Sequence, residues 1–174
     1  VEVLRVVAKP GDRVLINSPI YQNFYNWLSE TQMNVFDVPF TESDSGWYLD
    51  LSAIEEAYKA GVKVHALCNP HNPLGRLYSK VELETIANLA AKYQVIVVSD
   101  EIHAPLAYDA KKFIPFLSVN ESAAKIGIAV TSASKGWNLA GLKSAMIITQ
   151  DEFRHQQLDS LPMAVHFRSS LLGA

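Results

Sequence analysis

The sequence of 174 residues has the length of one domain, and 49% of its residues are hydrophobic, which is enough for a substantial core. Its formal net charge of −3 argues against nucleic-acid and anionic-membrane partners, because both favour basic patches. No apolar stretch approaches the ~18 residues that a membrane-spanning helix needs. The single cysteine, Cys68, cannot form an internal disulfide. We therefore expect a cytoplasmic protein without a membrane partner, with Cys68 as a buried, unreactive thiol.

The first part of the chain alternates between predicted helices and strands. Apolar residues at 3–7 suit the end of a helix, and "PGDRVLINSP" predicts a turn followed by a buried strand at 13–17. Aromatic and apolar residues at helical spacing predict a helix over 21–31, and 34–40 alternates like a strand. A helix over 50–61 is predicted to begin at a capping aspartate, Asp50, and to stop at Gly61.

The second part of the chain continues the alternation. The helix predicted over 79–93 begins with Ser79 as its cap, and Glu82 completes a capping box. A final helix is predicted over 151–161. Apolar strands are predicted at 63–69, 94–101, 125–133 and 143–150.

Strands that are apolar throughout and alternate with amphipathic helices are typical of a mostly parallel sheet with helices on both faces. We therefore predict an α/β fold of three layers, α/β/α, formed by one domain over 1–174. The chain opens inside an apolar pattern and stops at "SSLLGA", where another such pattern begins. We expect it to be a piece of a larger protein, truncated at both ends.

Three of the predicted strands end in polar residues. The clusters occupy 69–75, 100–103 and 132–135. Each cluster alone is weak evidence, because a polar residue at a strand end is often only a helix cap or a turn residue. In open α/β sheets, however, ligands bind beyond the carboxyl ends of the strands. The three clusters together therefore predict a site at this edge of the sheet.

The residue types in these clusters suit one kind of cofactor. A sheltered lysine has a lowered pKa and can form a Schiff base. A carboxylate can pair with a protonated ring nitrogen, an asparagine can donate to a ring oxygen, and serine hydroxyls with a nearby cation suit a phosphate. These are the requirements of pyridoxal 5′-phosphate, whose ring nitrogen must stay protonated for the ring to take up electrons.

The segments "NPHNPLGR", "VVSDEIH" and "SASKGWNLAGLK", in this order and spacing, resemble the class I/II aminotransferase-like (fold-type I) enzymes that use pyridoxal 5′-phosphate. Within them, the sequence is most similar to the cystathionine β-lyase or C–S β-lyase group. The resemblance implies that 1–174 is the large, cofactor-binding domain of the family, without the C-terminal small domain. It also implies a homodimer in which the partner subunit completes the site, and a small amino acid as substrate.

The resemblance implies roles for individual residues around the cofactor ring. Lys135 would bind the cofactor covalently and later move the Cα proton of the substrate. Asp100 would form a salt bridge with the ring nitrogen, and Asn72 would hydrogen-bond the ring oxygen. Tyr21, in "SPIYQNF", would stack on the ring face. His103 stands where several aminotransferases have a tyrosine near the ring oxygen, and this departure favours the lyase group.

The resemblance also implies which residues bind the phosphate. Ser132 and Ser134 flank the lysine, and Ser132 in particular would hold the phosphate group. Lys143 occupies a position where many aminotransferases place an arginine for this purpose. A lysine supplies the charge but lacks the bidentate geometry of an arginine.

Several alternatives remain open from the sequence. An aminotransferase is the main enzymatic alternative to a lyase, and a regulatory module that binds pyridoxal 5′-phosphate is another. "SASK" matches the S-x-x-K pattern of penicillin-recognising enzymes, but neither S-D-N nor K-T-G appears. The histidines show no metal-ligand spacing, and we expect His65, His155 and His166 to be ordinary core or surface residues.

Overall fold

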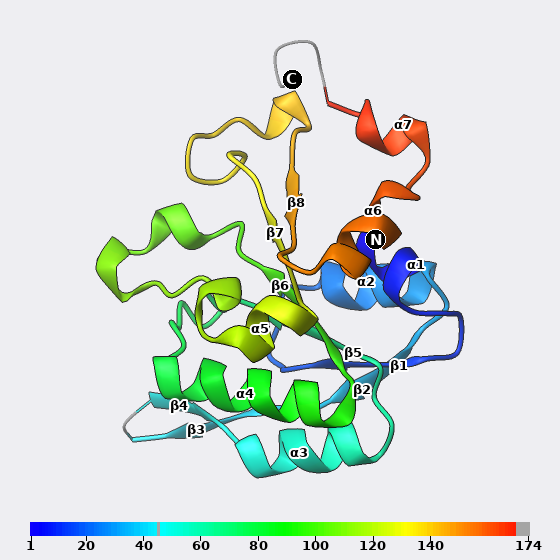
Figure 1. Ribbon diagram of the computed structural model, residues 1–174. Coiled ribbons are helices and arrows are strands. Elements are labelled where there is room, and N and C mark those ends of the chain that lie inside the picture. The colour runs from blue at the N-terminus through cyan, green and yellow to red at the C-terminus, as the bar shows by residue number, and fades with distance from the viewer. Residues whose placement is uncertain (45, 170–174) are drawn as a thin grey trace.

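The computed structural model describes residues 1–44 and 46–169, and its centre is a six-stranded sheet in the order β2-β1-β5-β6-β7-β8 (Figure 1). The strands are β1 (Arg13–Ile16), β2 (Asn34–Asp37), β5 (Val64–Cys68), β6 (Ile96–Asp100), β7 (Gly127–Thr131) and β8 (Met146–Ile148). The first five pair in parallel, and β8 is antiparallel to β7. The predicted mostly parallel sheet is therefore confirmed.

Helices cover both faces of this sheet, as Figure 1 shows. One face is covered by α3 (Leu51–Lys59), α4 (Lys80–Tyr93) and α5 (Glu121–Ile126). The other is covered by α1 (Glu2–Val7), α2 (Asn23–Glu30) and α6 (Glu152–Asp159), and α7 (Met163–His166) follows α6. Short 3₁₀ turns are η1 (Ala104–Leu106), η2 (Ala110–Lys112), η3 (Phe116–Ser118) and η4 (Ala140–Leu142). The three-layer α/β/α fold is confirmed.

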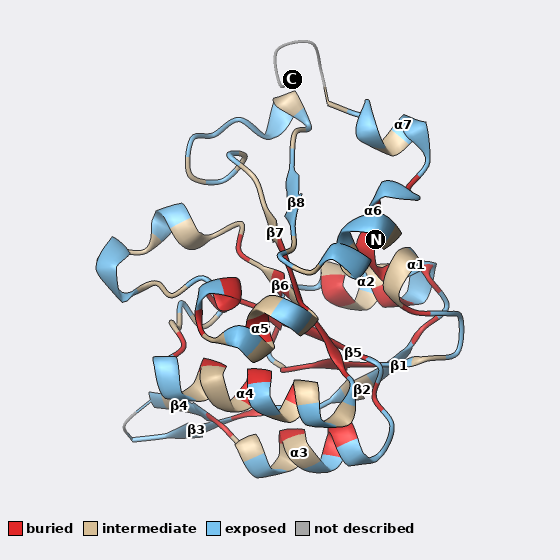
Figure 2. Cartoon of the chain, in the orientation of Figure 1, coloured by how far each residue is buried: buried red, intermediate tan, exposed pale blue. Residues whose placement is uncertain are grey.

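Successive strand residues point to opposite faces of the sheet and supply two separate cores. Leu15, Leu67 and Val97 join the core under α3, α4 and α5. Their neighbours Val14 and Ala66 join the core under α1, α2 and α6. Figure 2 shows the buried residues concentrated in the central strands, and all five residues of β5 are buried. A strand buried on both faces explains why its sequence is an apolar run instead of an alternating pattern.

The strand predicted over 143–150 is limited to Met146–Ile148, and two other regions also differ from the prediction. The single strand predicted over 34–40 is divided at Pro39, which cannot donate a hydrogen bond to a neighbouring strand. After this break, β3 (Phe40–Ser43) pairs antiparallel with β4 (Gly46–Leu49) in a separate hairpin. The strand predicted to begin at residue 125 begins at Gly127, because the two preceding residues complete α5.

Both predicted capping residues are confirmed, and the helix predicted to begin at residue 21 begins at Asn23. The Asp50 carboxylate accepts hydrogen bonds from the main-chain N–H groups of Ser52 and Ala53, at 2.9 and 3.0 Å. Ser79 and Glu82 form the predicted capping box, in which each side chain bonds the main chain of the other residue. Both caps satisfy N–H groups that the first turn of a helix leaves without partners.

Replacing Ser79 by alanine is expected to lower the free energy of unfolding by about 1 kcal/mol, the usual value of an N-terminal cap. Urea unfolding followed by circular dichroism measures this change. Val81→Ala is the matched control on the same turn, because Val81 is 69% exposed. Equal losses for the two variants would show that the capping box contributes no specific stability.

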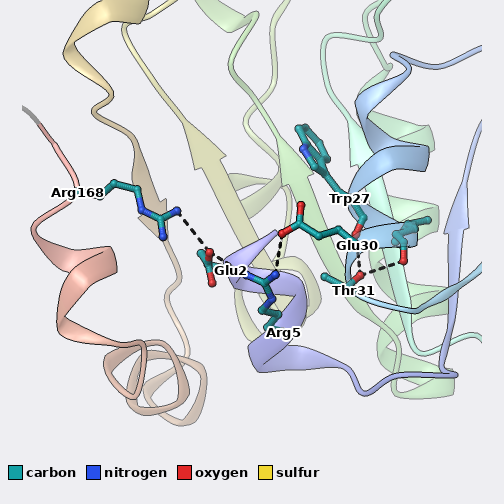
Figure 3. A network of polar contacts seen from close by, with 7 residues as sticks. Glu2, Arg5, Trp27, Glu30, Thr31 and Arg168 are labelled. Carbon is teal, nitrogen blue, oxygen red and sulfur yellow. Dashed lines mark hydrogen bonds and ion pairs between the residues drawn. The ribbon is translucent and has the colours of Figure 1, made fainter.

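Ion pairs join α1 to neighbouring elements (Figure 3). Arg5 bonds Glu2 at 3.0 Å and Glu30 of α2 at 2.7 Å, and Arg168 reaches Glu2 at 3.4 Å. At the end of α2, the Thr31 hydroxyl donates to the Trp27 carbonyl oxygen at 2.8 Å. Exposed ion pairs contribute little stability, so the apolar core determines the position of α1.

No helix within residues 1–44 and 46–169 combines the length and the apolar character that crossing a membrane requires. The last apolar pattern expected from the sequence, in "SSLLGA", falls mainly on residues 170–174, which lie outside the described residues.

Candidate active site

The three polar clusters lie side by side at one edge of the sheet. They follow β5, β6 and β7, which are adjacent and parallel. Cys68, the last residue of β5, is in register with Asp100, and Asp100 is in register with Val130 of β7. Main-chain hydrogen bonds continue past the strand ends, from Asn69 N–H to the Asp100 carbonyl oxygen at 2.9 Å and from Glu101 N–H to the Val130 carbonyl oxygen at 2.8 Å. The predicted meeting of the clusters is confirmed.

A cavity of about 420 Å³ opens at this edge and contains three of the predicted site residues. Asp100, Ser132 and Lys143 line it, together with the charged residues Glu2 and Arg168 and with apolar residues that include Val98 and Val130. A carboxylate, a hydroxyl and an ammonium group therefore share a mainly apolar space. Such a space strengthens the interaction of charged groups with a polar ligand.

Asp100 lies in this cavity as a largely buried carboxylate. Burial raises the pKa of Asp100, while a hydrogen bond from Ile102 N–H at 3.2 Å, the nearby His103 and the amino group of Val1 lower it. Within the described part of the chain, no lysine or arginine forms an ion pair with Asp100. A buried carboxylate without a lysine or arginine partner favours a positively charged ligand group.

Asn72 and His103 line a second cavity, of about 390 Å³. Among the described residues, the buried Nδ1 atom of His103 has no hydrogen-bond partner. Burial lowers the pKa of His103, Asp100 raises it and the positive charge of Lys135 lowers it. His103 is therefore within electrostatic reach of both Asp100 and Lys135.

Lys135 lies in the turn after β7, is exposed and lines neither cavity. The sheltered pocket expected around it is not formed by the described residues. Ser134 donates its N–H to the Ser132 hydroxyl at 3.1 Å, and that hydroxyl donates to the Ser144 carbonyl oxygen at 2.6 Å. A serine has one hydroxyl proton, so Ser132 would have to turn this proton away from Ser144 to donate to a phosphate.

Tyr21 follows the neighbouring strand β1, and its side chain is 42% exposed. Its N–H donates to the Asn72 carbonyl oxygen at 3.0 Å, which joins the two loops that carry the predicted ring-binding residues. Asn23 donates to the Tyr21 hydroxyl at 2.8 Å. Asn23 was not among the residues predicted to form the site. Its position two residues after the tyrosine, at the start of α2, is the signal that could have suggested this contact.

His65 and Cys68 belong to the core, as predicted. His65 Nδ1 accepts from the Tyr58 hydroxyl and Nε2 donates to Asn17 Oδ1, both at 2.8 Å. Burial lowers the pKa of His65 to about 3 and raises the pKa of the buried Cys68 thiol to about 12.

His155 and His166 are exposed, and His155 lies 3.3 Å from Asp159. Both therefore fit the predicted surface role. Within the described residues, no group of three or more histidine, cysteine or acidic side chains could hold a metal ion.

Replacing Asp100 by asparagine is expected to stabilise the cofactor-free protein near neutral pH. Because the native pKa of Asp100 is raised, the folded state binds more protons than the unfolded state between the ordinary and the raised value. The free energy of unfolding therefore falls as the pH rises through this window. The asparagine variant should lack the part of this decrease that Asp100 causes. Urea unfolding at a series of pH values measures the slope. Asp44→Asn, at an exposed carboxylate, is the control, and an unchanged slope for Asp100→Asn would contradict the expectation.

The architecture and this site define an α/β domain with a polar ligand site at the carboxyl edge of a parallel sheet. Residues 1–173 match the model of the family described as "Aminotransferase class I and II", and the chain belongs to this family. The family resemblance found in the sequence motifs is thereby confirmed.

Three relatives show the similarity in more detail. The chain is 42% identical, over 99% of its length, to a Mycobacterium tuberculosis protein named "Putative cystathionine beta-lyase", and covers 43% of that protein. It is 32% identical, over 90% of its length, to cystathionine beta-lyase PatB of Bacillus subtilis, and covers 41% of it. The crystal structure of Treponema denticola cystalysin, which contains pyridoxal 5′-phosphate, matches with a TM-score of 0.88 and 27% identity, over 99% of this chain and 44% of cystalysin. The chain thus spans less than half the length of these relatives.

Proposed function

We propose that this chain forms the cofactor-binding part of an enzyme that performs β-elimination on a sulfur-containing amino acid. The substrate is cystathionine or another S-substituted cysteine, which reacts with water to give a thiol, pyruvate and ammonia. The main structural support is the buried carboxylate of Asp100, which has no ion pair within the described residues and lies near His103. Relatives named cystathionine beta-lyase support the choice of reaction.

The residues present fit pyridoxal 5′-phosphate as the cofactor. Asp100 suits a protonated ring nitrogen, because the cation would compensate its buried charge. Asn72 suits the ring oxygen and Tyr21 the ring face, since these two residues are joined by a main-chain hydrogen bond. Ser132, with Ser134 beside it, and Lys143 suit the phosphate, provided that the Ser132 hydroxyl turns towards it. When bound, the cofactor supplies an electron sink for negative charge at the substrate Cα.

The residues of this chain have distinct tasks in the proposed reaction. Lys135 would hold the cofactor covalently, and its Nζ atom would move the proton at the substrate Cα. This requires the exposed Lys135 side chain to turn from solvent towards the site. Asp100 holds a proton at the ring nitrogen. Burial lowers the pKa of His103, and its Nδ1 atom, which has no hydrogen-bond partner among the described residues, would be available to the ring oxygen.

The aminotransferase is the second candidate, and the family to which the chain belongs supports it. Two sequence features favour elimination instead. His103 replaces the tyrosine found in several aminotransferases, and the segment "GWNLAGLK" after Lys135 is more similar to the lyase group.

We further propose that residues 1–174 belong to the large domain of a homodimeric enzyme, with a site that the partner subunit completes. Relatives more than twice as long as this chain support the assignment to a larger protein, and the dimer rests on the family resemblance. A cytoplasmic location is proposed on the buried, single cysteine. Light scattering and cell fractionation of the full-length protein test these points. A fully active monomer, or a protein recovered outside the cytoplasm, would contradict them.

The full-length protein, loaded with pyridoxal 5′-phosphate and given L-cystathionine, is expected to release pyruvate, ammonia and a free thiol in equal amounts. No 2-oxo acid should be needed, because elimination regenerates the cofactor in each cycle. Lactate dehydrogenase coupling measures pyruvate, and a thiol reagent measures the second product. A protein that is inactive until a 2-oxo acid is added, and then forms the matching amino acid, is an aminotransferase.

A further inference from the structure

His71 is a buried histidine in the loop that carries Asn72, and the chemistry described above does not use it. Its side chain is only 1% exposed. The loop leaves β5 and returns at Arg76, where the main chains of residues 71 and 76 form an isolated antiparallel bridge. The His71 ring lies edge-on against Phe40 of the hairpin, with 4.6 Å between the ring centroids.

Both ring nitrogens of His71 have partners, and these partners determine the position of the proton. Nε2 lies 2.9 Å from the Pro19 carbonyl oxygen, which can only accept, so Nε2 carries the proton and donates. Nδ1 lies 3.1 Å from the Tyr78 hydroxyl and therefore accepts. Burial lowers the pKa of His71, which agrees with a neutral ring.

These contacts join two loops at the carboxyl edge of the sheet. Pro19 lies in the loop after β1, two residues before Tyr21, and His71 directly precedes Asn72. The Tyr21 N–H to Asn72 carbonyl bond, 3.0 Å long, is a second connection between the same two loops. The Asn72 N–H also points to the Cys68 sulfur at 3.4 Å. The main chain of Asn72 is therefore held on both sides, and the His71 ring is the side-chain link that fixes one loop against the other.

We propose that His71 is a positioning residue for cofactor binding, which holds Asn72 and Tyr21 in register through its Nε2–H bond to the Pro19 carbonyl oxygen. This inference rests on the proposed function, because Asn72 and Tyr21 are assigned to the ring of pyridoxal 5′-phosphate there. In this proposal, His71 affects cofactor binding without contacting the cofactor.

His65 provides a matched comparison within the same chain. It is also completely buried, and it also accepts from a tyrosine hydroxyl at Nδ1 and donates from Nε2. Its acceptor is the side chain of Asn17, which donates in turn to the Val38 carbonyl oxygen. His65 therefore stabilises the core, whereas His71 connects two loops of the site. A loss of buried hydrogen bonds at either position lowers stability, but only the loss at His71 should also change how the cofactor is bound.

The test uses the visible absorption of the full-length protein loaded with pyridoxal 5′-phosphate, titrated with pH. An amide N–H that donates to the ring oxygen stabilises the negative charge of this oxygen. It therefore lowers the pH at which the bound cofactor becomes protonated. His71→Phe keeps the aromatic contact with Phe40 but loses both hydrogen bonds. We expect it to raise the pH midpoint of the absorption change by about one unit, the size expected when a hydrogen bond to a charged oxygen weakens. The dissociation constant of the cofactor should rise about tenfold, by the same free energy.

A double-mutant cycle separates positioning from general destabilisation. In an Asn72→Ala background, His71→Phe should shift the midpoint no further, because the amide that donates to the ring oxygen and sets the midpoint is gone. His71→Gln, whose amide can still donate to Pro19, should lie closer to the wild type, and it provides the comparison if His71→Phe does not fold. His65→Phe should lower the melting temperature and leave the midpoint unchanged.

Three results would overturn the inference. They are a folded His71→Phe protein with the wild-type midpoint, a shift that adds fully to that of Asn72→Ala, and an equal shift for His65→Phe. A wild-type protein that develops no visible band with pyridoxal 5′-phosphate would instead overturn the proposed function, and the positioning role with it.

Discussion

Replacing Lys135 by alanine is expected to abolish the covalent adduct that borohydride traps between the full-length protein and pyridoxal 5′-phosphate. Turnover should fall by about 10²–10⁴-fold or more, because the variant lacks the amine that moves the Cα proton. Mass spectrometry of the reduced protein locates the adduct, and pyruvate release measures turnover. Both readouts are needed, since loss of turnover alone also follows from misfolding.

Lys143 is the competing candidate and the appropriate control. It lines the cavity that contains Asp100, whereas Lys135 is exposed in the turn after β7. On the proposed assignment, Lys143→Ala should weaken cofactor binding by removing a charge near the phosphate, yet leave the adduct on Lys135. A reduced adduct on Lys143 in the wild-type protein would show that the lysine which lines the cavity is the reactive one. The roles of the two lysines would then be exchanged.

The sheet and its ligand edge were predictable because their signals are local. The runs at 63–69 and 94–101 are long and apolar, and polar residues follow both of them immediately. Parallel pairing of neighbouring strands then places these residues at the same edge. Helix α4 was predictable for the same reason. Ser79 and Glu82 are three residues apart, and the side chain of each accepts a hydrogen bond from the main-chain N–H of the other.

The parts that were not predicted depend on contacts between distant segments or on short elements. The β3–β4 hairpin lies outside the main sheet, and Pro39 interrupts an otherwise continuous alternation. Helix α5 has only six residues, too few for a clear periodic pattern. The contact of His71 with Pro19 joins residues 52 positions apart, and nothing in the residues around either one indicates it.

The exposure of Lys135 is a further limit of sequence reasoning. The motif gives the position of the lysine in the chain, after a buried strand and between two serines. It does not give the direction of the side chain, which in a turn depends on the neighbouring loops and on any bound group. The positive charge of Lys135 lowers the pKa of His103, so Lys135 lies near that residue, but its side chain is exposed to solvent.

Asp100→Ala is expected to lower turnover by about 10²–10³-fold, the usual loss when a buried group that stabilises charge in the reaction is removed. The carboxylate is desolvated in the cavity, where its interaction with a protonated ring nitrogen is strong. Asp100→Glu should retain more activity, because it keeps the charge, whereas Asp100→Asn should resemble the alanine variant. The asparagine variant should also be more stable than the wild type without cofactor, so its loss of turnover could not be attributed to unfolding.

Turnover and stability measured on the same three variants therefore test one physical explanation. The charge that is unfavourable in the cofactor-free protein is the charge that the ring nitrogen requires. Adding pyridoxal 5′-phosphate should raise the melting temperature of the wild type and of Asp100→Glu more than that of Asp100→Asn. Near wild-type turnover for Asp100→Ala, or an equal increase in melting temperature for all variants, would reduce Asp100 to a structural residue at the end of β6. The proposed fit of the cofactor would then lose its main support.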